Sequence, residues 1–216
     1  MFVGHLAVAL GAKRASPRTP LAALVAAAFG LDLIWPILLL AGIERVRIDP
    51  GHTAFTPLAF EHYPWSHSLS MAVVWGAVVG RFSVVVLKRS VAGLLIGSAL
   101  VSHWLLDFVT HVPDLPLWPG GPVVGLGLWN SIPGTLIVEG ALFAAAIAVY
   151  LRGTHPRKAA GKWSLWSLVA LTTLIWISGP WSPPPPDERA IAWVALAMWL
   201  FPYWGTWIDR TRQSIY

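Results

Sequence analysis

The sequence contains no cysteine and few charged residues. None of its 216 residues is a cysteine, which excludes disulfides, thiolate zinc sites and cysteine nucleophiles. Only 12% of the residues are charged, whereas a soluble globular domain carries about a quarter. A water-facing surface cannot be built from so few charges, so the composition predicts an integral membrane protein.

The chain also lacks a basic face for nucleic acid and the layout of a signal peptide. Its formal charge is +5, but the Lys and Arg residues are dispersed between apolar runs, so we expect no nucleic-acid binding. The first apolar stretch, residues 2–12, precedes Lys13 and Arg14, whereas basic residues come first in a signal peptide. This stretch is too short to cross a bilayer, and we predict a half-spanning or interfacial helix.

Hydrophobic residues make up 56% of the chain and gather in long runs. A membrane-spanning helix needs about 20 mostly apolar residues. The predicted fold is an all-α, polytopic transmembrane helix bundle, with about six spanning helices plus the short N-terminal apolar helix, in one domain over residues 1–216. The predicted spans are residues 20–42, 69–87, 91–111, 134–151, 163–181 and 190–208.

The basic residues between the predicted spans are distributed unevenly. Eleven lie in alternate connections, and only Arg45, Arg47 and Arg189 lie in the others. Cytoplasmic connections carry the excess of Lys and Arg, so the basic side and the C-terminus are predicted to be cytoplasmic. We therefore expect a multi-pass protein of a bacterial inner (plasma) membrane, with residues 43–68, 112–133 and 182–189 outside.

Several ionisable residues fall within or beside the predicted spans, where each costs about 2.5–3.5 kcal/mol. By depth they converge on the outer side of the membrane, which accidental polar residues would not do. A helix-packing role for Asp32 and a capping role for Glu139 are the alternatives for single members. The convergent residues are Asp32, His62, His67, His103, Asp107, His111 and Glu139.

The segment S-H-W-L-L-D-F-V-T-H, residues 102–111, has a helical spacing of polar groups. Residues four apart lie about 6 Å apart along a helix and share one face. His103, Asp107 and His111 should therefore form a stripe that binds a metal or relays protons. Imidazole and carboxylate suit zinc, manganese or iron. His62 and His67 lie on either side of Ser66, which we predict to cap the following helix.

Two further residues have open assignments. His5 would reach Asp32 if the first helix dips towards the outer half of the membrane, and otherwise it is an interfacial residue. Asp114 is either a turn residue in V-P-D-L-P or a further ligand.

The order and spacing of these motifs resemble a known family. The chain is similar to the LexA-binding, inner-membrane-associated hydrolases, also described as membrane-bound metal-dependent hydrolases. The similar segments are His5, L-D-L-I-W-P (31–36), H-x(4)-H-S (62–68), S-H-W-L-L-D with its trailing histidine (102–111), and residues 125–139. The resemblance covers roughly residues 1–140, and residues 141–216 carry no evident site residue. The chain has Tyr63 where the family often has an arginine that would contact a phosphate or oxyanion.

These patterns lead to a functional expectation. We expect a metal-dependent hydrolase, with zinc the first choice of divalent ion and manganese or iron the alternatives. Asp32 and Glu139 are the predicted catalytic residues, Glu139 as general base. A site near the outer leaflet favours a lipid or lipid-linked substrate and membrane lipids as partners; the sequence does not identify a protein partner. The alternatives are a proton- or cation-coupled transporter component and a scaffold with a structural metal. The predicted metal ligands are His5, His62, His67, His103, Asp107 and His111.

Overall fold

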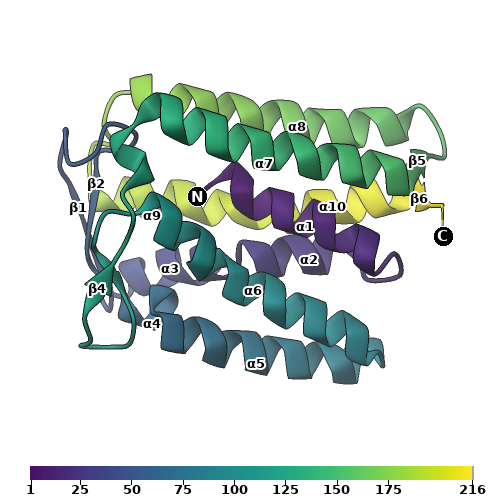
Figure 1. Ribbon diagram of the computed structural model, residues 1–216, viewed down its shortest axis with the longest axis horizontal. Coiled ribbons are helices and arrows are strands. Elements are labelled where there is room, and N and C mark those ends of the chain that lie inside the picture. The colour runs from purple at the N-terminus through teal and green to yellow at the C-terminus, as the bar shows by residue number, and fades with distance from the viewer. Residues whose placement is uncertain (216) are drawn as a thin grey trace.

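Long helices dominate the computed structural model, which describes residues 1–215 (Figure 1). The prediction of an all-α helix bundle is confirmed. Within residues 1–215 the strands form three short antiparallel ribbons, β1–β2, β3–β4 and β5–β6. The helices are α1 Val3–Ala15, α2 Leu21–Ala28, α3 Gly30–Leu40, α4 Pro64–His67, α5 Leu69–Leu87, α6 Ser90–Thr110, α7 Ile132–Gly153, α8 Ala160–Ser178, α9 Glu188–Leu196 and α10 Leu200–Thr211. The strands are β1 Arg45–Ile48, β2 Leu58–His62, β3 Leu115–Pro116, β4 Val123–Val124, β5 Thr154–Pro156 and β6 Arg212–Ser214.

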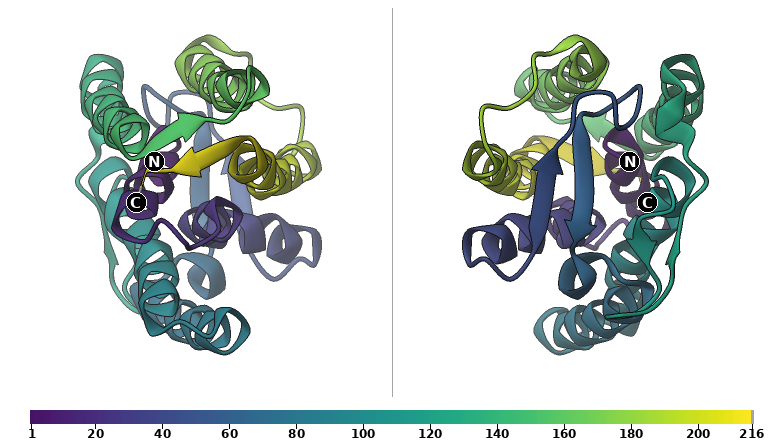
Figure 2. Two further views of the ribbon diagram at one scale, coloured as in Figure 1. Left: turned by 90° about the vertical axis from the view of Figure 1, so that its right-hand side faces the viewer. Right: turned by 90° about the vertical axis from the view of Figure 1, so that its left-hand side faces the viewer.

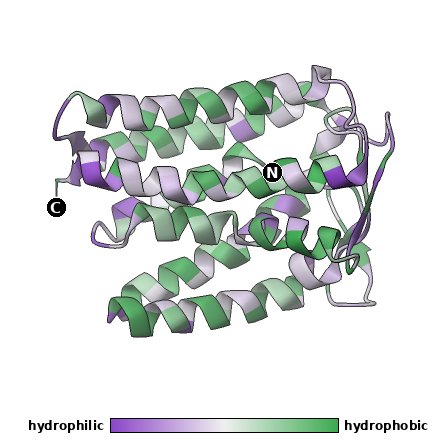
Figure 3. Ribbon diagram, turned by 180° about the vertical axis from the view of Figure 1, so that it is seen from behind, coloured by the Kyte–Doolittle hydropathy of each residue, from purple (hydrophilic) through white to green (hydrophobic). Residues whose placement is uncertain are grey.

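Five helical segments among residues 1–215 are each long and apolar enough to cross a membrane. The bent pair of α2 and α3 makes a sixth if it counts as one span. Figure 3 shows hydrophobic residues along the lengths of the helices and hydrophilic residues mainly towards the two ends. Length and hydropathy therefore agree with a membrane protein. The five segments are Leu69–Leu87, Ser90–Thr110, Ile132–Gly153, Ala160–Trp181 and Glu188–Thr211.

The first predicted span is a broken helix. The sequence predicted one helix over residues 20–42, but α2 ends at Ala28 and α3 begins at Gly30, with a bend of 55° between them. Pro36 lies inside α3 and has no backbone N–H to donate to the carbonyl four residues earlier. The break places Asp32 in the first turn of α3 and leaves the Ala28 carbonyl available to a side chain.

The short N-terminal helix is not interfacial. α1 packs against α2, α6 and α7, and most of its side chains are buried, His5 among them. Gly4 leaves room for the Met1 side chain, which a Cβ at this position would overlap. The interfacial alternative is therefore wrong, whereas a short helix of 13 residues inside the bundle agrees with the half-spanning alternative.

Alternate connections meet at the same end of the bundle, as the distribution of basic residues predicted. The α1–α2, α5–α6 and α7–α8 connections share one end with the β5–β6 ribbon (Figure 1). The β1–β2 ribbon lies across the opposite end (Figure 2). We call these the β5–β6 end and the β1–β2 end.

Candidate metal centre

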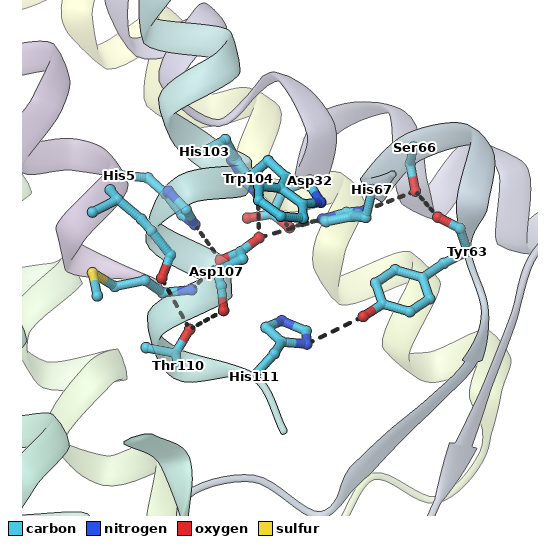
Figure 4. A network of polar contacts seen from close by, with 12 residues as sticks. His5, Asp32, Tyr63, Ser66, His67, His103, Trp104, Asp107, Thr110 and His111 are labelled. Carbon is cyan, nitrogen blue, oxygen red and sulfur yellow. Dashed lines mark hydrogen bonds and ion pairs between the residues drawn. The ribbon is translucent and has the colours of Figure 1, made fainter. Parts of the chain in front are cut away.

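Helices α1, α3, α4 and α6 bring five imidazole and carboxylate side chains together (Figure 4). His103 and Asp107 lie in the second half of α6, which ends at the β1–β2 end of the bundle. The side chains form two groups that share His103. One group is His5, His103 and Asp107, and the other is Asp32, His67 and His103. Within each group, one ligand atom from each residue lies within 4.8 Å of the others. The buried cluster could therefore hold a metal ion.

The predicted helical pair on α6 is confirmed. His103 Nε2 lies 3.0 Å from Asp107 Oδ2, one helical turn away, and both residues are almost fully buried. On the other side of the ring, His103 Nδ1 donates to the Ala28 carbonyl at 2.8 Å, because a carbonyl can only accept. The helix break at residue 29 thus fixes the orientation of this imidazole.

His67 is oriented by a buried relay from the β1–β2 end. Glu44 Oε2 accepts the hydroxyl proton of Ser66 at 2.6 Å, and Glu44 Oε1 accepts the backbone N–H groups of Trp65 and Ser66. The only hydroxyl proton of Ser66 is used in its hydrogen bond to Glu44. Ser66 Oγ therefore accepts a hydrogen bond from His67 Nδ1 at 2.7 Å. The Nε2 atom of His67 then points towards the cluster.

The two oriented histidines leave a charge problem that a cation would solve. With Nδ1 donating, a neutral imidazole has a lone pair on Nε2. His103 Nε2 lies 3.7 Å and His67 Nε2 3.4 Å from Asp32 Oδ1, and His67 Nε2 is 3.9 Å from Asp107 Oδ2. Lone pairs and carboxylate oxygens repel each other at these distances. Positive charge must lie between them, either as protons on the rings or as a metal ion held by one of the two groups of three.

His5 completes the opposite side of the cluster. Its Nε2 lies 3.2 Å from Asp107 Oδ1, and its ring stacks on that of His103 with centroids 3.6 Å apart. Asp107 Oδ1 also contacts the amino nitrogen of Met1. Asp107 therefore directs one oxygen towards His5 and the other towards His67 and His103. The sequence predicted that His5 would either reach Asp32 or lie at the membrane interface. The structure places His5 inside the bundle, but its carboxylate partner is Asp107 and not Asp32.

The two predicted catalytic carboxylates occupy different positions. Asp32 belongs to one candidate ligand group, and its side chain is 23% exposed, the most open of the five. Glu139 is fully buried on α7 and lies outside both groups. Its Oε2 accepts from the backbone N–H of Phe2 at 3.0 Å, and its Oε1 has no hydrogen-bond partner among residues 1–215. A buried acceptor atom without a donor is available to a water molecule or a substrate proton.

His111 does not continue the predicted stripe. α6 ends at Thr110, and His111 is its C-cap with extended backbone angles. Pro113 disfavours helical geometry at Val112, so the helix cannot continue past this point. His111 Nδ1 lies 2.9 Å from Asp114 Oδ1, which also accepts the Tyr63 hydroxyl at 2.9 Å. Burial, reinforced by Asp114, raises the pKa of Tyr63 well above that of an ordinary tyrosine, so the phenol stays a donor. This polar group is separate from the candidate metal groups.

His62 also lies apart from the cluster. It is exposed on β2, opposite Arg45 in the ribbon, and it belongs to neither candidate group. Ser66 does not cap the following helix; Ser68 does, accepting from the Met71 N–H at 3.3 Å. Ser66 instead orients His67.

Sequence reasoning missed two parts of the centre. The Ala28 carbonyl has no sequence signature, because its role depends on the break in the first span. Glu44 stands in a loop beside Arg45 and Arg47, where a carboxylate normally belongs to a solvated surface, yet it is 1% exposed. A buried glutamate reaching the Ser66–His67 dipeptide is visible only in three dimensions.

Comparison of the chain with protein-family models, curated proteins and solved structures finds no match. The evidence for the site is therefore its own geometry: three histidines and two aspartates lie in an apolar helix bundle, and the rings of His67 and His103 are fixed by hydrogen bonds from outside the cluster.

Proposed function

We propose that the protein is a membrane-embedded hydrolase that depends on a divalent metal ion. The ligands would come from His5, Asp32, His67, His103 and Asp107, with zinc the first candidate and manganese or iron the alternatives. The observation that supports this proposal is the pair of Nε2 atoms, on His67 and His103, directed at carboxylate oxygens 3.0–3.9 Å away. The resemblance to the membrane-bound metal-dependent hydrolases favours the same activity.

The surroundings of the ligands suit a metal site. Metal-binding histidines usually donate their second ring N–H to a carbonyl or carboxylate, directly or through a relay, and this increases their basicity. Ala28 O accepts the Nδ1–H of His103, and Ser66 Oγ, itself hydrogen-bonded to Glu44, accepts the Nδ1–H of His67. A divalent ion bound here would activate a water molecule and polarise the scissile group of a substrate.

Two residues have roles beyond binding the ion. Glu139 would accept the proton of the attacking water at its free Oε1 atom, as a general base does. Asp32, the partly exposed member, would lie where a substrate enters. The helices around the site are apolar and long enough to cross a membrane, so we propose a lipid or lipid-linked ester or phosphoester as substrate. The basic residues assign the β1–β2 end to the outer face of the inner membrane.

The proposal is tested by hydrolysis assays on the detergent-purified protein. Substrates would be lipid-linked carboxylic and phosphoric esters, measured after chelation and after addition of zinc, manganese or iron. We expect one substrate class to be cleaved, activity to disappear on chelation, and one metal to restore it. Asp32→Asn should lower the activity strongly, whereas Asp49→Asn, on the exposed loop of the same end, should not.

Two other outcomes would replace the proposal. Cation flux in proteoliposomes that depends on His103, with no hydrolysis, would indicate a transporter. Bound metal that only raises the unfolding temperature, again without hydrolysis of any ester, would indicate a structural metal in a scaffold.

A further inference from the structure

A second polar cavity lies at the β5–β6 end, far along the bundle from the metal centre. It has a volume of about 670 Å³ and lies between the α1–α2 connection, the end of α7, the β5–β6 ribbon and the end of α10. Five basic side chains and one carboxylate line it, together with hydroxyl groups. The basic residues are Lys13, Arg18, Arg157, Arg210 and Arg212.

The cavity has a buried arginine without an anionic partner. Arg212 is 5% exposed, and its guanidinium donates to Thr154 Oγ1, Thr154 O and Gly161 O, all of them neutral. The guanidinium also lies over the ring of Tyr150, 5.5 Å from its centroid. Burial lowers the pKa of Arg212 below that of an ordinary arginine, as expected for a cation removed from water.

The carboxylate in the cavity does not balance this charge, because it is already paired. Asp209 Oδ1 accepts from Lys13 Nζ at 2.7 Å, and Asp209 Oδ2 accepts the backbone N–H of Leu21. The Lys13 ammonium also donates to the Thr19 carbonyl at 2.8 Å. One basic residue and one acidic residue thus cancel, and the remaining arginines dominate the potential of the cavity.

Three further arginines, Arg18, Arg157 and Arg210, are exposed around it. None of their side chains has a hydrogen-bond or ion-pair partner within the described part of the chain, residues 1–215. They come from the α1–α2 connection, the residue after β5, and the last turn of α10. Four cations from separate segments thus surround one cavity and leave guanidinium donors unused.

We propose that this cavity binds a phosphate-bearing anion, with the headgroup of an anionic phospholipid as its principal ligand. Guanidinium groups bind phosphate oxygens in a bidentate manner, and basic pockets between membrane helices on the cytoplasmic side accept anionic headgroups. The cavity lies at the end of the bundle that the distribution of basic residues assigns to the cytoplasm, where the adjacent leaflet is anionic. A soluble phosphate compound has the same chemistry and is the other source.

Native mass spectrometry of the detergent-solubilised protein would test this site, with phosphatidylglycerol and phosphatidylcholine as the two probes. We expect preferential binding of phosphatidylglycerol. Arg18→Gln/Arg157→Gln should weaken it roughly thirtyfold, the effect of two phosphate-facing arginines. The matched control is Arg152→Gln/Lys158→Gln, which removes two charges exposed near the same end but outside the cavity lining, and it should bind as the wild type does.

Inorganic phosphate separates the two sources. Displacement of phosphatidylglycerol by phosphate supports an anion site open to soluble compounds, and resistance to displacement supports a site that also requires the lipid chains. Equal losses in the two double variants would overturn the proposal, because they would indicate diffuse attraction to a basic surface. Equal binding of the two lipids by the wild type would overturn it as well. Unfolding temperatures of both variants show whether each is folded.

Discussion

The two ends of the bundle carry unbalanced charge of opposite sign. Near the β1–β2 end, carboxylate oxygens of Asp32 and Asp107 face the Nε2 atoms of His67 and His103 at 3.0–3.9 Å. The Met1 ammonium pairs with Asp107 Oδ1, so a second negative charge and the facing lone pairs still need a cation to balance them. At the β5–β6 end, Arg212 is buried against neutral oxygens while other arginines line the same cavity, and positive charge lacks an anion. Each end therefore suits an ion of the opposite sign.

The difference lies in burial as well as in sign. The candidate metal ligands are 0–5% exposed apart from Asp32, and second hydrogen bonds fix the rings of His67 and His103. The arginines around the cavity are mostly exposed and unrestrained, with only Arg212 held in place. Buried ligands with fixed orientations favour a small metal ion that requires a defined coordination geometry. Exposed, unrestrained guanidinium groups favour a larger phosphate group, which they can contact in several arrangements.

The largest effect should come from Glu139→Gln. The variant keeps the shape of the side chain and the hydrogen bond from the Phe2 N–H but removes the basic oxygen. Loss of a general base lowers hydrolysis by about 10²–10⁴-fold. Metal content should stay at the wild-type level, because Glu139 belongs to neither ligand group. A variant that hydrolyses its substrate normally would remove Glu139 from the mechanism.

Ser66→Ala tests the relay behind His67. Without the hydroxyl, the ring loses its acceptor at Nδ1 and Glu44 loses one of its three donors. Loss of a hydrogen bond behind a metal ligand weakens metal binding by about 10–100-fold. The measurement is competition with a metal-sensitive dye, with Ser178→Ala, exposed at the end of α8, as the control. Equal affinities in the two variants would mean that His67 does not bind the metal.

Lys13→Met addresses the opposite end. It removes the ammonium that neutralises Asp209 and places an unpaired carboxylate beside the arginine cavity. A negative charge a few ångströms from a bound phosphate should weaken phosphatidylglycerol binding roughly tenfold. The double variant Lys13→Met/Asp209→Asn should recover most of that loss. If it binds the lipid as weakly as Lys13→Met alone, Asp209 has no electrostatic role in the cavity.

The smallest effect should come from His62→Ala. His62 was predicted to be a metal ligand, but it is exposed on β2 and outside both ligand groups. Metal affinity should stay within about twofold of the wild type, as for most surface substitutions. A loss comparable to that of Ser66→Ala would mean that β2 folds onto the cluster when metal is bound.

Features that depend on local periodicity were predictable from the sequence. The apolar runs gave the spanning helices, and the four-residue spacing placed His103 and Asp107 side by side on α6. The same spacing failed for His111 because α6 ends one residue earlier. Pro113 indicates that the helix ends before it, but the apolar residues around it favoured a prediction that the helix extends to residue 111.

Features that depend on contacts between distant segments were not predictable. The bend between Ala28 and Gly30 frees the carbonyl that orients His103, although the sequence there reads as a continuous apolar helix. The buried position of α1 depends on its packing against α2, α6 and α7, and only that packing brings His5 to Asp107. Glu44 was missed for the same reason, since its burial depends on the segment that carries Ser66.

The most direct test of the metal centre is elemental analysis of the purified protein beside His103→Ala/Asp107→Ala, both shown to be folded. The proposed centre predicts one or two equivalents of zinc, manganese or iron in the wild type and background levels in the double variant. An absence of bound metal from a wild-type protein incubated with each of these ions would contradict it. The charges between the histidines and aspartates would then be balanced by protons alone.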